Sequence, residues 1–179
     1  MSQHGERYTP ASRLLHWTMA GLVPLQFALG WVAEHGVGDA ASMRLLRWHY
    51  LLGMLLCALL VLRIAARAWR SPFPPAGEPH WRRRVAAGVH GLLYLLLATL
   101  PVTGYVLWVW MEAPMCLFGP FDMSRLFTPP AEDETLRAWS WYAHVLGGWL
   151  FVALVALHAG AALWHRFVRQ DHRVFRRMA

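Results

Sequence analysis

The sequence contains no lysine and few acidic residues. All 17 basic residues are arginines, opposed by 10 acids, and charged residues make up 15% of the 179 positions, against about 25% in soluble domains. Four segments carry no charged side chain at all, namely 14–33, 48–62, 85–111 and 138–165. This shortage of charge excludes an ordinary soluble domain and indicates a membrane protein.

Cysteine is also scarce, since only Cys57 and Cys116 occur. Cys57 falls inside an apolar segment and Cys116 in a connecting loop, so we expect two free thiols and no disulfide framework. The formal net charge of +7 would suggest nucleic acid if it lay on one soluble face. The arginines flank the apolar segments instead, so we expect lipid contact and no nucleic-acid partner.

The uncharged segments predict four transmembrane helices. A bilayer core of about 30 Å needs about 20 apolar residues, and three segments reach that length. The shortest, 48–62, spans if its flanking arginines extend to the interface. We therefore predict an all-α membrane protein, a four-transmembrane-helix bundle forming one domain over residues 1–179, with helices at about 10–33, 40–69, 79–111 and 132–166.

The arginines are distributed unequally between the two sides of this bundle. The side that holds both termini carries 13, and the other side carries four together with seven acids, which leaves a net charge of −3. Loops rich in arginine stay in the cytoplasm. We therefore predict that both termini are cytoplasmic in a multi-pass protein.

Histidine is unusually frequent inside the predicted spans. Six of the ten histidines lie there, at His16, His49, His90, His144, His158 and His165. A polar side chain in lipid is costly and usually faces the interior of the bundle with a partner. An interhelical hydrogen bond would explain any single one, but their spacing points to a shared role.

Two pairs of histidines are expected at two depths. His144 and His158 are 14 residues apart, which returns to within about 40° of one helix face, about 21 Å along the axis. His16 matches the cytoplasmic depth of His158, and His49 matches the outer depth of His144. His90 enters from the cytoplasmic end and is the rival of His16. The sequence thus predicts two bis-imidazole sites, His16/His158 and His49/His144.

Paired imidazoles across a helix bundle are what a six-coordinate haem requires, because both axial positions are filled. The chain has no Cys-x-x-Cys-His sequence, so such haems would be non-covalent and of b type. A zinc or copper site is the competing interpretation, but it needs Cys, Asp or Glu at one depth. The spans contain only Cys57 of these types.

Three further residues fit this interpretation. Gly53 and Gly148 each follow a predicted outer ligand by four residues, where a missing side chain leaves room for a flat porphyrin; close helix packing is the alternative. Arg63 lies 14 residues after His49, so we expect it at the inner level near a haem propionate. Extension of its side chain to the interface is the alternative there.

These residues resemble the bacterial cytochrome b561 family, di-haem relatives of the cytochrome b subunits of membrane hydrogenases and formate dehydrogenases. The resemblance covers nearly the whole chain and lies in Arg13-Leu-Leu-His16-Trp17, Trp48-His49-Tyr-Leu-Leu-Gly53, the run from Trp81 through His90-Gly-Leu-Leu-Tyr94, and Ala143-His144-Val-Leu-Gly-Gly148-Trp149 continuing to His158 and His165. It implies two b haems in the pairing given above, a bacterial inner-membrane location and electron exchange with quinone.

The resemblance also suggests a reaction, because some members oxidise superoxide at the outer face and reduce ubiquinone. An enzyme that collects an anion benefits from a positive mouth; here the outer side is net negative, although Arg44 and Arg47 near His49 offer a local positive patch. The alternative is a cytochrome subunit that docks a partner dehydrogenase or hydrogenase. A metal or proton transporter that uses its histidines is a candidate of a different class.

The quinone end is expected at the cytoplasmic interface. His165 shares a face with His158 and lies about 10 Å nearer the cytoplasm. Arg13, Arg67 and Arg166 fall at the same end of the predicted bundle. His165 is predicted to hydrogen-bond a quinone carbonyl or a propionate, and an interfacial histidine with a hydrated tip is the alternative.

Overall fold

The computed structural model describes residues 8–68, 79–112, 116–118, 121–122, 125–130 and 134–170. It confirms an all-helical architecture of four long helices, α1 (Pro10–His35), α2 (Asp39–Ala68), α3 (His80–Trp110) and α4 (Thr135–Phe167). Every bound lies within three residues of the range expected from the sequence. Two short antiparallel strands between α3 and α4, β1 (Cys116–Phe118) and β2 (Phe121–Asp122), were not expected.

The start of α1 and its turn into α2 are fixed by local hydrogen bonds. The Thr9 hydroxyl accepts a bond of 3.1 Å from the amide of Ser12, and Pro10 occupies the first helical position, where no amide hydrogen is needed. At the other end the Ser42 hydroxyl donates to the carbonyl of Ala33 over 2.8 Å. The first bond caps α1, and the second ties the start of α2 to the end of α1 in an antiparallel hairpin.

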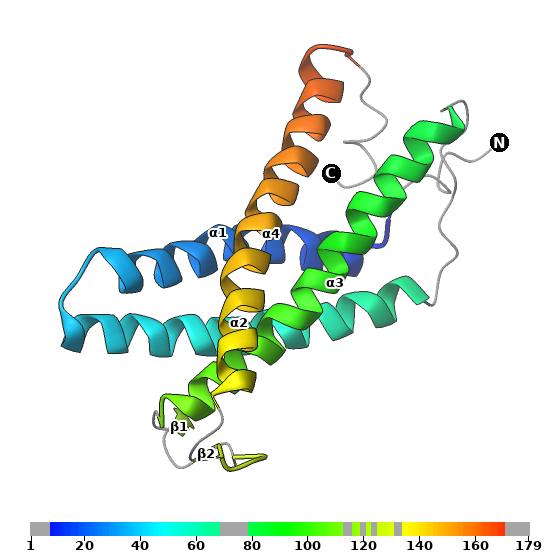
Figure 1. Ribbon diagram of the computed structural model, residues 1–179. Coiled ribbons are helices and arrows are strands. Elements are labelled where there is room, and N and C mark those ends of the chain that lie inside the picture. The colour runs from blue at the N-terminus through cyan, green and yellow to red at the C-terminus, as the bar shows by residue number, and fades with distance from the viewer. Residues whose placement is uncertain are drawn as a thin grey trace.

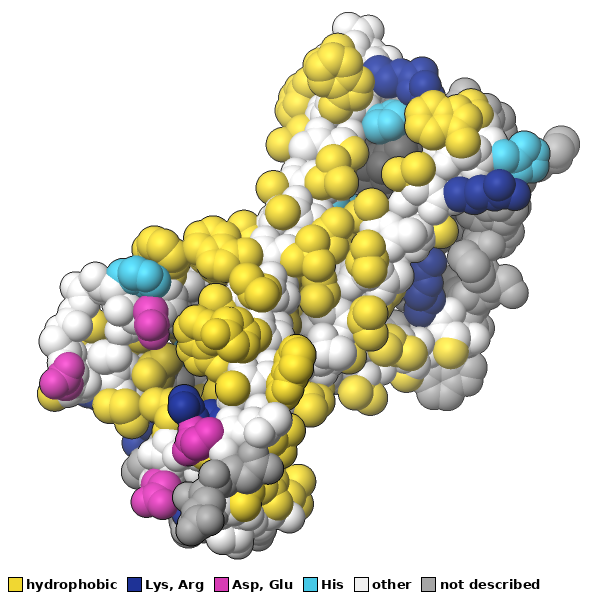
Figure 2. Space-filling view, viewed as in Figure 1, with side chains coloured by type: hydrophobic (Ala, Val, Ile, Leu, Met, Phe, Trp, Pro, Cys, Tyr) yellow, Lys and Arg dark blue, Asp and Glu magenta, His cyan; other side chains and the backbone are white. Residues whose placement is uncertain are grey.

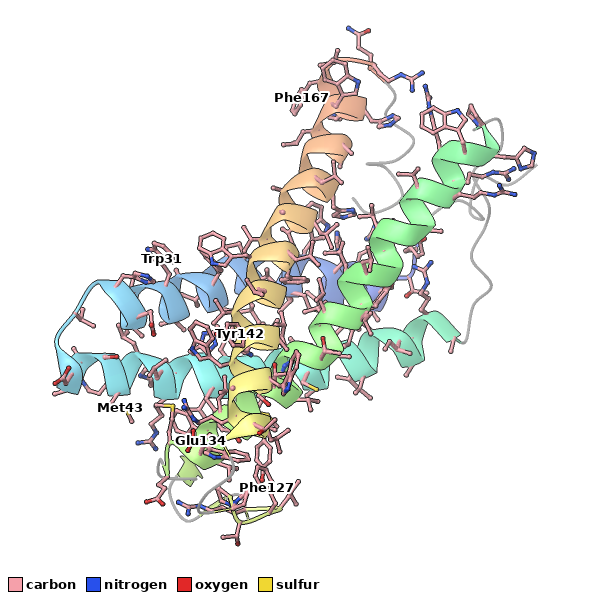
Figure 3. All side chains as sticks on the ribbon, in the orientation of Figure 1. Trp31, Met43, Phe127, Glu134, Tyr142 and Phe167 are labelled. Carbon is pink, nitrogen blue, oxygen red and sulfur yellow. The ribbon has the colours of Figure 1, made fainter. Side chains whose placement is uncertain are left out.

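The molecule consists of two helical hairpins that cross. Helix α1 packs chiefly on α2, and α3 chiefly on α4, while the hairpins meet mainly through α2 and α3. Figure 1 shows the α1–α2 hairpin running across the α3–α4 hairpin rather than alongside it. In Figure 3 the side chains of the two hairpins meet at this crossing, while Phe167 lies near the free end of α4.

Few side chains are buried inside the protein. One small cluster comprises Met19, Leu56 and Leu60, and another comprises Tyr50, Leu51 and Trp108. Large apolar side chains point outward along every helix. Figure 2 shows apolar side chains spread along the whole length of the face in view. An apolar surface of this extent is unfavourable in water but normal against lipid tails.

Three helices are long and apolar enough to cross a membrane, and they are α2, α3 and α4. This describes a multi-pass membrane protein. Helix α1 is not among them, because its uncharged stretch includes the polar side chains of His16 and Gln26 together with Pro24. The fourth span therefore stays a prediction.

The charged side chains follow the predicted asymmetry along the chain. Glu34, Asp39 and Glu134 lie at the turn between α1 and α2 or just before α4. Figure 2 shows acidic groups gathered at those ends and arginines at the far ends of α3 and α4. Cys57 is a free thiol, as expected, whereas the side chain of Cys116 lies outside the described part of the chain.

Candidate functional site

The two histidines expected at the outer level lie together. His49 on α2 faces His144 on α4, with ring centroids 5.9 Å apart and ring planes inclined by 72°. Both side chains are partly buried. The pair therefore bridges the two hairpins.

Both outer rings are oriented by the backbone of a neighbouring helix. Nδ1 of His49 lies 2.9 Å from the carbonyl of Gln26 on α1, and Nδ1 of His144 lies 3.0 Å from the carbonyl of Leu100 on α3. A carbonyl only accepts hydrogen bonds, so each of these two contacts requires the proton on Nδ1. Nδ1 of His144 also lies 3.0 Å from the hydroxyl of Thr103, which donates to the carbonyl of Leu100 and can accept from the ring. Each Nε2 then keeps the lone pair that a metal requires.

A set of three histidines forms the inner level. The ring centroid of His158 on α4 lies 6.3 Å from that of His16 on α1 and 5.1 Å from that of His90 on α3. The structure thus brings together the predicted pair, His16 and His158, and also His90, the alternative to His16. Neither His16 nor His158 makes a hydrogen bond to another described residue.

The spacing of the rings can be compared with that of two imidazoles on one metal. An imidazole nitrogen binds a metal at about 2 Å, which leaves the centroids of two opposed rings about 6 Å apart. His49/His144 at 5.9 Å and His16/His158 at 6.3 Å match this value, and His90/His158 at 5.1 Å is shorter. Within the described segments, no group of three or more His, Cys, Asp or Glu side chains is arranged to bind a bare metal ion.

Arg63 lies at the inner level, where the sequence places it. Its Nε donates to the Tyr94 hydroxyl over 3.1 Å, and an amino group donates to the carbonyl of Ser12 over 3.4 Å. Its charge acts on His16, His90 and His158. The guanidinium thus joins α2 to α1 and α3 and makes this level positive.

The two glycines expected to make room for a porphyrin differ in the space beside them. A Cβ at Gly148 would meet nothing within 4 Å, so that position is open. A Cβ at Gly53 would lie 3.1 Å from Nε2 of Gln26, so the amide of Gln26 occupies that space. The Oε1 atom of Gln26 is buried with no hydrogen-bond partner in the described part of the chain. Gln26 was not expected at this site from the sequence, although an amide in the middle of a span is a signal.

His165 lies in a cleft between the first turn of α3 and the last turn of α4. Of the described residues, Arg82, Trp164, His165 and Arg169 line it. Figure 2 shows the surface hollowed near the upper ends of these helices. Nδ1 of His165 is buried and has no hydrogen-bond partner among the residues that the structure describes.

The surroundings of His165 differ from those predicted. Arg13 and Arg67, from the α1–α2 hairpin, do not line the cleft, and neither does Arg166. Because the hairpins cross, the start of α1 and the end of α2 diverge from the start of α3 and the end of α4 (Figure 1). Arg82 and Arg169, which lie at the ends of α3 and α4 within one hairpin, take their place.

Comparison with known proteins gives one consistent result. A family model described as prokaryotic cytochrome b561 matches residues 7–179. The chain is 33% identical over 175 residues to cytochrome b561 homolog 2 of Escherichia coli (strain K12), which covers 93% of this chain and 88% of the relative. It is 25% identical over 179 residues to cytochrome b561 homolog 1 of the same organism, covering 96% and 97% of the two chains. Cytochrome b562 of Cereibacter sphaeroides is 29% identical over 177 residues, covering 96% of this chain and 94% of the relative.

Proposed function

The chain belongs to the prokaryotic cytochrome b561 family, and on that premise we propose that it passes electrons across the membrane through two non-covalent b-type haems. Membership itself implies transmembrane electron transfer through b-type haem. The number of haems, their ligands and the substrates are the proposal. In this proposal α1 also spans the bacterial inner membrane, and both termini are cytoplasmic.

The observation that supports two haems is the pair of opposed imidazoles at each of two levels. His49 and His144 would hold the outer haem, and His16 and His158 the inner one, at ring separations of 5.9 and 6.3 Å. Each pair of imidazoles would leave no open position for a substrate, and the bound haem would supply one-electron transfer. Bonding of Nδ1 to a carbonyl at His49 and His144 presents Nε2 to the metal.

The remaining polar residues would tune and connect these sites. Arg63 would balance a propionate at the inner level, where its charge already acts on the histidine rings. Gly148 would accommodate the flat ring of the outer haem, because no atom lies within 4 Å of its missing Cβ. Gly53 would do so if the amide of Gln26 turned aside.

The donor would act from the periplasmic side, and superoxide is the first candidate. Two superoxide anions would each release one electron and leave as dioxygen, and a ubiquinone would take up the two electrons with two protons from the cytoplasm. Arg44 and Arg47 are exposed within two turns of His49 and would attract the anion locally. A protein donor, as in a cytochrome subunit that docks a dehydrogenase or hydrogenase, is the alternative.

The quinone would bind at the cleft that contains His165. The buried Nδ1 of His165 would donate a hydrogen bond to a quinone carbonyl, and Arg82 and Arg169 would stabilise the negative charge that develops on reduction. Arg13, Arg67 and Arg166 would contribute only a more distant positive field at the cytoplasmic interface.

Two measurements on the purified protein test the proposal. A visible spectrum with a pyridine haemochromogen assay should give two b haems per chain; a histidine-based metal or proton transporter would be colourless. Stopped-flow reduction of the oxidised protein by superoxide, ubiquinol and ascorbate then identifies the donor. Reduction by none of them would instead favour a docked partner protein, and fewer than two haems would refute the ligand assignment.

A further inference from the structure

The imidazole of His49 sits in a gap on the surface of α1. A Cβ added at Gly30 would lie 2.9 Å from Cε1 and 3.0 Å from Nδ1 of His49. Real Cβ atoms do not approach a ring this closely, so any side chain at position 30 would displace the imidazole or the helix. Nδ1 of the same ring donates to the carbonyl of Gln26, four residues earlier on α1.

The same arrangement recurs in the second hairpin. A Cβ added at Gly104 on α3 would lie 3.0 Å from Cε1 of His144. Nδ1 of His144 donates to the carbonyl of Leu100, again four residues before the glycine. In each hairpin the second helix therefore supplies the histidine, and the first helix supplies a carbonyl and a glycine one turn apart.

The four-residue spacing has a physical cause. In a regular α-helix the carbonyl of residue i pairs with the amide of residue i+4, and the Cβ of that residue leans back toward the helix N-terminus over the preceding turn. This Cβ normally covers the side from which a second donor would reach the carbonyl. Glycine at i+4 removes this obstruction and leaves the carbonyl open to an imidazole from a neighbouring helix.

We propose that Gly30 and Gly104 are positioning residues for the outer haem, each forming a seat that holds one axial histidine with Nδ1 as donor and Nε2 free. This inference rests on the proposed function, because it assumes that His49 and His144 are ligands. A hydrogen bond from the second ring nitrogen fixes the ring orientation and raises ligand basicity. No such backbone bond is made by His16 or His158 in the described chain, so the effect belongs to the outer level.

The test compares two glycine variants with two matched controls. Gly30→Ala and Gly104→Ala fill the seats, whereas Gly21→Ala and Gly88→Ala change the same two helices where a Cβ meets nothing within 4 Å. At 100° per residue, Gly21 lies about 180° around α1 from Gly30, and Gly88 about 160° around α3 from Gly104. Each pair thus makes one chemical change on opposite faces of one helix.

The readouts are haem content, the electron paramagnetic resonance signal of each oxidised haem, and a redox titration. We expect roughly 10- to 100-fold weaker retention of the outer haem in the seat variants, as when other partners of metal-binding histidines are removed. Where the outer haem is retained, its resonance and potential should shift. The inner haem should remain in all four variants and so reports correct folding.

The outcomes separate this inference from the proposal beneath it. An unchanged outer haem in both seat variants, or equal loss of both haems in them, would overturn the seats while leaving the two-haem assignment intact. Equal effects in the control variants would also overturn them. If His49→Leu and His144→Leu left the wild-type haem content unchanged, the ligand assignment itself would fail.

Discussion

The outer and inner histidine levels are built differently from the same residue type. At the outer level two rings meet across the hairpins, and each is tied to a backbone carbonyl beside a glycine. At the inner level the rings of His16 and His90, from two further helices, meet the ring of His158 under the charge of Arg63. Packing and backbone hydrogen bonds fix the orientation of the outer rings. The predicted inner ligands, His16 and His158, make no hydrogen bond to a backbone carbonyl in the described part of the chain. The inner level should therefore respond more to charge and the outer level more to shape.

Removal of a predicted haem ligand should have the largest effect and tests whether the outer and inner levels are independent. His49→Leu or His144→Leu should abolish the outer haem alone, and His158→Leu should abolish the inner haem alone, because leucine offers no ligand. Haem quantification and low-temperature spectra of the purified variants give the measurement. Loss of both haems from any one of these variants would show that the levels are not independent.

The crowded inner level makes a second test necessary, because His16 and His90 both contact His158. The 6.3 Å spacing of His16 from His158 favours it as the ligand over His90 at 5.1 Å. His16→Leu should remove the inner haem, and His90→Leu should retain both haems with a perturbed inner spectrum. The reverse pattern would exchange their roles.

A smaller effect is expected at the cleft of His165, which we propose to bind quinone. His165→Leu should leave both haem spectra intact and slow haem oxidation by a short-chain ubiquinone about tenfold or more, because a donor to the developing negative charge is lost. His35→Leu, in the last turn of α1 in the other hairpin, serves as the control. Unchanged kinetics in His165→Leu would remove the quinone from this cleft, and loss of a haem would make His165 a ligand.

The smallest expected change is a shift in the redox potential of the inner haem when the charge of Arg63 is removed. A cation near a haem disfavours the more positive oxidised state, so Arg63→Leu should lower the inner potential by about 60 mV, equivalent to a tenfold shift of a one-electron equilibrium. Arg63→Lys should retain most of the wild-type value, and Arg44→Leu should leave the inner potential unchanged. A shift confined to the outer haem would contradict the assignment of levels.

Features that depend only on position along a single helix, such as its bounds and the depth of its histidines, could be predicted from the sequence. The helix bounds follow from uncharged length, and the meeting of His49 with His144 follows from depth and helical period. Neither feature depends on how the helices cross. The choice between His16 and His90 as the inner ligand does depend on it, so both stayed candidates.

The features that depend on packing in three dimensions could not be predicted. The arginines around His165 are Arg82 and Arg169 rather than Arg13 and Arg67, because the direction of each hairpin is set by side-chain contacts. The space beside Gly53 is filled by Gln26 from another helix. Gly30 and Gly104 carry no local signal, because a glycine in a membrane helix is common and its neighbour is known only from the fold.

The pairing of α1 with α2 and of α3 with α4 has a consequence for assembly. Each hairpin makes most of its contacts within itself, while both predicted haems take one ligand from each hairpin. The two halves should therefore insert into the membrane independently and be joined afterwards by haem, as two pieces cross-linked at two points. Chains cut between Ala68 and His80 should reassemble when co-produced in cells that make haem, and should separate when haem synthesis is blocked.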